Sequence, residues 1–229
     1  MGDQWLDQRG KRSPQHRTLA ATDRYRLAVR ELNWQAKNAD IEVNTLVRAR
    51  TLADAAKSLT AHSQVTLALS PTTSNERLIG FLSELKTMTS RTLDGSFPPF
   101  RHLLPSESVA EATIEVGPLL DSVRRVALVT DKTVPLRLIF NNNTLQLEAG
   151  AGEDAQATEE LEIIYSGEPI NIAFNPQYLT DGLQAIGTPF VQFNFTGASK
   201  PAVLTGKHEL SGTRDISYQY LLMPMRYSA

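Results

Sequence analysis

The stretch LTDGLQAI, residues 179–186, is one of three copies of a short pattern that decides how this chain folds. The other copies are LADAAKSL at 52–59 and LLDSVRRV at 119–126. All three have Leu at position one, Asp at position three, a small or apolar residue at position five and an aliphatic residue at position eight. This spacing places the apolar positions on one face of a helix.

The surroundings of the three copies indicate a larger repeated unit. An apolar residue lies five places before each copy, namely Val47, Ile114 and Phe174, and the copies begin 67 and 60 residues apart. Alternating strand patterns follow the first and third copies, VTLAL from Val65 and VQFNF from Val191. The sequence therefore predicts an α+β fold of tandem half-domain repeats, each with one helix packed on an antiparallel sheet.

Composition limits the class of protein. The chain has 229 residues, 41% of them hydrophobic and 21% charged, which is typical of a globular protein with one large or two smaller domains. Cysteine is absent, which excludes disulfides and thiolate metal sites. We expect a cytoplasmic protein, because no apolar run approaches the ~20 residues of a membrane helix and the first residues lack a signal-peptide core. The net charge of -2 gives no overall attraction to nucleic acid.

Changes in sequence pattern and a proline-rich stretch predict that the chain has three parts. Residues 1–17 show neither helical nor strand periodicity and are predicted to be a disordered lead-in, with a basic arm for nucleic acid as the alternative. Strand patterns begin at Thr18 and include IEVNTLV at 41–47, and FPPF at 97–100 with Pro105 beyond it suggests a domain boundary. We expect an incomplete central domain at 18–101 and a complete C-terminal domain at 102–229.

The last residues are unusually apolar for a chain end. YQYLLMPMR at 218–226 carries two Leu, two Met and a Pro, whereas chain ends usually fray and are polar unless they are tied down. Either a last strand docks in the core or an apolar surface is kept for a partner. Met and Leu would give such a surface a deformable floor, and Pro224 would stiffen the backbone.

Four segments together resemble the bacterial sliding clamp, the beta subunit of DNA polymerase III. They are TLAATDRYRLAVREL at 18–32, DGSFPPFRHLLP at 94–105, YSGEPINIAFNPQYLTDGLQAI at 165–186 and YLLMPMR at 220–226, and the first is most similar to actinobacterial members. The resemblance implies the DNA clamp fold, in which three domains of two half-domain repeats lie in a row. It also implies that two chains join head to tail as a ring around duplex DNA.

The same resemblance implies a hydrophobic pocket that takes short linear motifs of the type Gln-Leu-x-Leu-Phe. Its partners would be DNA polymerase subunits, the clamp loader and repair proteins. The implied pocket residues are Thr22, Arg24, Tyr25, Arg26, Leu27, Pro98, His102, Leu103, Ser199, Pro201, Leu221, Leu222, Met223, Pro224, Met225 and Arg226.

Contact with duplex DNA is the second implied role. Family clamps hold the duplex through cationic side chains on inner helices, which contact phosphates and read no bases. The candidates here are Arg48, Arg50, Lys57, Arg124 and Arg125, and the third helix offers none. A solvated helix face would give the same pattern of charges.

No catalytic chemistry is predicted, and no cofactor or metal. The histidines at 16, 62, 102 and 208 lack ligand spacing, and GASKPAVLTGK at 197–207 is interpreted as a hairpin loop because Pro201 replaces the first Gly of a phosphate loop. Two hypotheses follow: a fragment of a processivity clamp, or an interaction module or decoy that captures clamp-binding motifs without holding DNA. Because no segment resembles the N-terminal domain of the family, we expect this chain to be monomeric, with DNA contact only if a ring forms.

Overall fold

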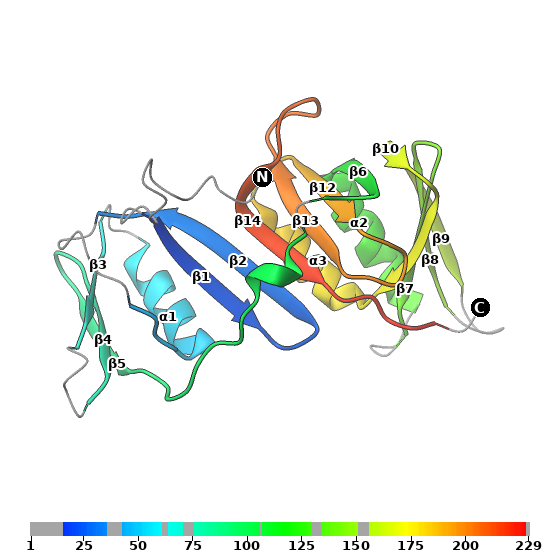
Figure 1. Ribbon diagram of the computed structural model, residues 1–229. Helices are drawn as coiled ribbons and strands as arrows, with labels where there is room; N and C mark the ends of the chain where they lie inside the picture. The colour runs from blue at the N-terminus through cyan, green and yellow to red at the C-terminus, as the bar shows by residue number, and fades with distance from the viewer. Residues whose placement is uncertain are drawn as a thin grey trace. The chain divides into compact units, whose positions relative to one another are not determined.

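The computed structural model describes residues 16–35, 43–60, 64–70, 76–105, 107–129, 134–150 and 156–227. The chain divides into two compact units, and each is described by itself. The larger unit comprises Met1–Ala36 and His102–Ala229, and the smaller one is Lys37–Arg101. Figure 1 shows the elements of both.

The larger unit contains two antiparallel sheets and two helices. The first sheet has seven strands in the order β1-β2-β14-β13-β12-β6-β10, and the second has four in the order β11-β7-β8-β9. The elements are β1 (His16–Thr22), β2 (Arg26–Asn33), β6 (Ala110–Glu115), α2 (Val116–Val126), η2 (Ala127–Val129), β7 (Leu136–Asn141), β8 (Thr144–Ala149), β9 (Ala157–Glu162), β10 (Ile164–Gly167), β11 (Ile170–Phe174), α3 (Pro176–Ile186), β12 (Phe190–Phe195), β13 (Ala202–Lys207) and β14 (Asp215–Leu222). A 3-10 turn, η1 (Arg101–Leu103), spans the point in the chain where the smaller unit ends and the larger unit resumes.

The two half-domain repeats of this unit exchange their leading strands. β6 precedes α2 but pairs with β12 in the sheet that follows α3, whereas β11 precedes α3 but pairs with β7 in the sheet that follows α2. The predicted half-domain repeat is confirmed: a strand, a helix and three strands form the copy around α3, and a strand, a helix and four strands form the copy around α2. The exchange makes one folded unit of the two repeats, because neither sheet is complete without a strand from the other copy.

The core of the larger unit contains the predicted helix faces. Leu119, Val123 and Val126 of α2 are fully buried, and so are the equivalent Leu179, Leu183 and Ile186 of α3. Aromatic side chains from both sheets meet there: the ring centroid of Phe140 lies 4.9 Å from that of Phe195 and 5.8 Å from that of Phe193. Each fully buried Leu or Phe contributes roughly 1.5–3 kcal/mol, so this face determines the fold.

Local sequence fixes both ends of α3. The Asn175 side chain accepts hydrogen bonds from the backbone N–H groups of Gln177 and Tyr178 at 3.0 and 3.1 Å, and Pro176 occupies the first turn. Gly187 has a φ of 72° and ends the helix in the left-handed conformation that Gly adopts without strain.

The smaller unit has one helix and one sheet. Its elements are α1 (Ala49–Leu59), β3 (Thr66–Leu69), β4 (Leu78–Leu82) and β5 (Thr87–Arg91), with the strands in the order β3-β4-β5. Ala55, Leu59, Ile79 and Phe81 form its buried core. Ala56, at position five of the pattern, is exposed, and Ala55 is buried in its place.

A strand predicted over 41–47 is not formed in the described part of that segment. Over residues 43–47 the only pairing is an isolated bridge between Leu46 and Leu93. The first repeat therefore differs from the other two, because its leading segment contributes a single bridge where they contribute a whole strand.

The hairpin β1-β2 packs with the larger unit. β2 pairs antiparallel with β14 over five residues, and Leu27 and Val29 are buried. β1 begins at His16, so the prediction of a disordered lead-in is wrong for residues 16 and 17. Residues 1–15 of the predicted lead-in lie outside the described residues. The predicted division at 101/102 stays a prediction, and the structure groups residues 16–35 with the C-terminal half.

Candidate peptide-binding edge

Three segments of the chain enter or leave the seven-stranded sheet at the same end of its strands. Leu222, the last residue of β14, pairs with Ala202 at the start of β13 and with Arg26 at the start of β2. The residues before Ala202, before Arg26 and after Leu222 therefore lie together, and Figure 1 shows the blue hairpin beside the red end of β14. We call residues 22–27, 199–202 and 221–226 the tail edge.

Backbone hydrogen bonds hold the tail in place. The Met223 N–H donates to the Tyr25 carbonyl at 2.9 Å, and the Met225 N–H donates to the Ala173 carbonyl of β11 at 2.8 Å. The Tyr227 ring then lies over the guanidinium of Arg137, with 4.9 Å from the ring centroid to Cζ. The apolar tail is thus both a docked strand end and an extension across to the second sheet.

The predicted apolar residues separate into a buried floor and an exposed surface. Leu27 of β2 is buried, and so are Leu221 and Leu222 of β14, because both are inner strands of the sheet. Tyr25 is 61% exposed and Met223 is 40% exposed. Tyr25 and Met223 are therefore the exposed large apolar side chains of the tail edge.

Arg26 is locked inside the edge. Its Nη1 lies 2.6 Å from Asp181 Oδ2, its Nε lies 2.9 Å from Asp23 Oδ2, and its guanidinium stacks on the Tyr178 ring at 4.2 Å. Partial burial alone would lower the pKa of Arg26, but the hydrogen bonds to Asp181, Tyr220 and Asp23 outweigh burial and raise it. The arginine therefore joins the hairpin to α3 and β14.

Sequence reasoning missed the α3 residues that support this arrangement. The Tyr220 hydroxyl donates to the Tyr178 carbonyl at 2.8 Å, and its ring packs so closely on Gly182 that a Cβ there would lie 2.3 Å from a ring carbon. Two signals pointed to them: Asp181 occupies the shared third position of the repeat, and a Gly inside a helix has a stability cost that packing must offset.

The hairpin turn is held in a strained conformation. Arg24 has a φ of 80°, in the left-handed region that favours Gly. Thr22 Oγ1 accepts from the Arg24 N–H at 3.2 Å, and Asp23 Oδ1 accepts from the N–H groups of Tyr25 and Arg26 at 3.1 Å each. These side-chain bonds fix the turn, so the conformation of Arg24 is imposed by its neighbours.

The remaining predicted pocket residues are divided between the tail edge, the 3-10 turn η1 and the smaller unit. Ser199 and Pro201 lie in the β12-β13 hairpin loop, and Pro224, Met225 and Arg226 lie in the tail. The interpretation of residues 197–207 as a hairpin loop is confirmed for 197–201 and is wrong for 202–207, which form β13. His102 and Leu103 lie in η1, where both are exposed. Pro98 is exposed and belongs to the smaller unit.

The five cationic side chains predicted to contact DNA differ in how strongly they are paired with carboxylates. Arg48 and Lys57 at the two ends of α1 are exposed, and Arg50 has only a 4.0 Å contact with Asp54. On α2, Arg124 lies 3.6 Å from Asp121, whereas Arg125 binds both carboxylate oxygens of Glu159 at 2.6 Å. Arg125 is therefore the least available of the five for a phosphate.

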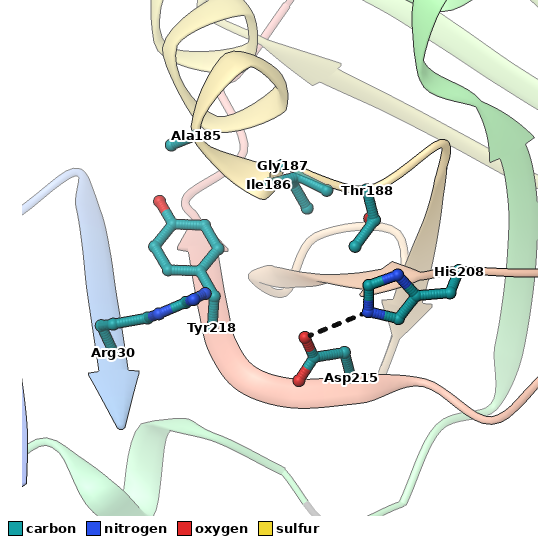
Figure 2. A pocket seen from close by; sticks show the side chains of 8 residues that line it. All are labelled: Arg30, Ala185, Ile186, Gly187, Thr188, His208, Asp215 and Tyr218. Carbon is teal, nitrogen blue, oxygen red and sulfur yellow. Dashed lines mark ion pairs between the residues drawn. The ribbon is translucent and has the colours of Figure 1, made fainter. Parts of the chain in front are cut away.

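A separate concavity of about 340 Å³ lies at the opposite end of β14. Figure 2 shows Arg30, His208, Asp215 and Tyr218 around it, next to the end of α3. His208 Nε2 lies 3.9 Å from Asp215 Oδ2, and burial raises the pKa of Tyr218 to about 12. Charged groups of both signs, Arg30 and Asp215, line this concavity together with the apolar Ala185 and Ile186.

Comparison with known proteins identifies the family of this chain. The family model for the C-terminal domain of the DNA polymerase III beta subunit matches residues 101–226, and the model for the central domain matches residues 11–99. The chain belongs to the DNA polymerase III beta subunit family. The resemblance seen in the sequence and the α+β clamp fold are thereby confirmed.

Individual relatives show how much of the family's length is present. The beta sliding clamp of Streptomyces coelicolor is 47% identical, with 92% of this chain and 56% of the relative covered. A beta sliding clamp homolog of Streptomyces muensis, GriR, is 39% identical, with 91% and 55% covered. The chain thus spans just over half the length of the curated relatives it matches.

Solved structures of sliding clamps share the fold. The DNA polymerase III beta protein from Pseudomonas aeruginosa aligns with a TM-score of 0.82 and 26% identity, over 93% of this chain and 56% of that one. A sliding clamp of the same organism bound to griselimycin aligns with a TM-score of 0.82 and 25% identity, over 93% of this chain and 55% of that one. Among the described residues, no helix has the length and apolar character needed to cross a membrane.

Proposed function

We propose that this chain is the central and C-terminal part of a sliding clamp that acts in DNA replication as a non-catalytic processivity factor. Its working site would be the tail edge, which captures Gln-Leu-x-Leu-Phe type motifs of polymerase subunits, the clamp loader and repair proteins. The meeting of the hairpin, the β12-β13 loop and the tail around the exposed Tyr25 and Met223 carries this proposal. A structurally similar clamp has been solved bound to griselimycin, which supports ligand capture by the family.

Peptide affinity tests the proposal. A fluorescent peptide with this motif should bind in the micromolar range, on the order of -8 kcal/mol. Met223→Glu places a charge against the apolar anchors, which should weaken binding by about tenfold or more. Leu222 is unsuitable for such a test because it is fully buried, and a charge there would disturb the fold.

Leu128→Glu is the matched control for that experiment. Leu128 is 84% exposed and lies in η2, outside the tail edge, so this variant should bind like the unchanged chain. If Met223→Glu binds the peptide as tightly as Leu128→Glu does, the tail edge is not the binding site.

Duplex DNA contact is the second part of the proposal. Arg48, Lys57 and Arg124 have the exposure that non-specific phosphate contact needs. Binding should weaken steeply with salt, whereas the decoy hypothesis expects peptide binding with no DNA binding. Because neither family match is the N-terminal domain, we also expect the 229-residue chain to be monomeric by light scattering, and a stable dimer would contradict this expectation.

A further inference from the structure

The tail edge carries more positive charge than its partners neutralise. Arg24, Lys200 and Arg226 are exposed, and they come from the hairpin, the β12-β13 loop and the tail respectively. Within the described ranges, none of the three has an ion-pair partner. The local carboxylates, Asp23 and Asp181, are both bound to Arg26.

This local excess of positive charge contrasts with the net charge of the whole chain, which is -2. Cations with no partner around an apolar surface attract a ligand of opposite charge and disfavour a basic one. The edge is therefore electrostatically complementary to an apolar segment that also carries carboxylates.

Arg24 is the member of this group placed at a structural cost. A Gly at its position would adopt the φ of 80° freely, whereas an L-residue there is strained. Bonds from Thr22 and Asp23 hold the turn regardless of the residue at 24, because they use backbone N–H groups and not the Arg24 side chain. The conformation of the turn therefore does not explain why residue 24 is an arginine. A role of its guanidinium in binding would explain it.

Residue 24 lies next to the exposed apolar surface along the chain. Arg24 immediately precedes Tyr25, and the Tyr25 carbonyl bonds the Met223 N–H at 2.9 Å. A peptide that covers Tyr25 and Met223 must therefore pass next to residue 24. A guanidinium recognises a carboxylate through two parallel hydrogen bonds, which an ammonium cannot reproduce.

We propose that the tail edge selects linear motifs with acidic side chains next to their apolar anchors, and that Arg24 is the specificity-determining residue. This inference rests on the proposed function, because it concerns which motifs the same edge prefers. The apolar anchors supply most of the affinity, and Arg24 discriminates among motifs that share them.

Two peptides with one apolar core test the inference. One carries Asp and Glu beside the Gln-Leu-x-Leu-Phe core, and the other carries Asn and Gln at the same positions. The unchanged chain should bind the acidic peptide about threefold to tenfold more tightly at low salt, as expected for exposed charge pairs. The preference should shrink at high salt because exposed charges are screened.

Arg24→Gln should abolish most of that preference, so that this variant binds the acidic and the neutral peptide with nearly equal affinity. Arg30→Gln is the matched control, because Arg30 is an exposed cation of the same hairpin that lies at the concavity of Figure 2, so it should retain the preference. Equal affinities of the unchanged chain for both peptides, or a preference that survives in Arg24→Gln, would overturn the inference while the proposed function stands. If neither peptide binds, the proposed function itself fails.

Discussion

At the scale of single residues, Arg24 is expected to trade stability for binding. A residue other than Gly in the left-handed region costs about 1 kcal/mol or more. Arg24→Gly should therefore raise the free energy of unfolding by up to about 1 kcal/mol, after the extra entropy of Gly in the unfolded chain is deducted. Thermal denaturation should show a rise in Tm of a few degrees, and a fall in Tm would show that the arginine is not strained.

Gly182 gives a second prediction at this scale, because helix propensity and packing disagree about it. Propensity alone favours Gly→Ala inside a helix by up to ~1 kcal/mol. A Cβ at residue 182 would collide with the Tyr220 ring, so Gly182→Ala should instead destabilise by roughly 1–3 kcal/mol. Gly117→Ala in α2 is the control, because nothing lies within 4 Å of its added Cβ and no such collision follows. Its effect should be small, since residue 117 precedes Pro118, which offsets the gain in helix propensity. Equal effects of the two substitutions in chemical denaturation would contradict the packing account.

At the scale of elements, the hairpin β1-β2 depends on one ion pair with α3. Asp181→Ala leaves the partly buried Arg26 with Asp23 alone, at a cost of about 1 kcal/mol because both side chains keep some solvent contact. Backbone amides of β2 that bond β14 should then exchange about fivefold faster, while those between β12 and β13 should not change. Asp54→Ala, at the same position of the first repeat, loses only a 4.0 Å surface contact and should have no such effect. Unchanged exchange in β2 after Asp181→Ala would show that strand pairing alone holds the hairpin.

Elements were predictable from sequence where their determinants are local. The three helices follow from apolar spacing and, for α3, from Asn175, Pro176 and Gly187 at its ends. The exchange of β6 and β11 between repeats was not predictable, because the sequence pattern of a leading strand is the same whichever of the two sheets it joins. The pairing of β2 with β14 links residues about 190 positions apart, and no local pattern encodes it.

The candidate site shows the same limit. Resemblance to the family pointed to the hairpin, the loop and the tail, and the register at Leu222 brings them together. It did not separate the exposed Tyr25 and Met223 from the buried Leu221 and Leu222, since both kinds are apolar in sequence. That distinction depends on β14 being an inner strand, which only the sheet order shows.

At the scale of the whole molecule, a single folded unit supports the tail edge. The edge draws on β2, β13 and β14 and is braced by α3 and β11, all within the larger unit. Peptide binding should therefore not require a ring, whereas processive retention on DNA would. We therefore expect peptide binding and retention on DNA to be separable by experiment.

The most direct test of the peptide-binding edge is a map of amide chemical shifts in the isotope-labelled 229-residue chain as a Gln-Leu-x-Leu-Phe peptide is added. The largest changes should fall within the tail edge, residues 22–27, 199–202 and 221–226, with smaller ones in α3 near Tyr178 and Asp181. Amides around Arg30 and Asp215, at the concavity of Figure 2, should stay unchanged. Shifts concentrated at that concavity or on α1, or no saturable change at all, would contradict the assignment of the tail edge as the binding site.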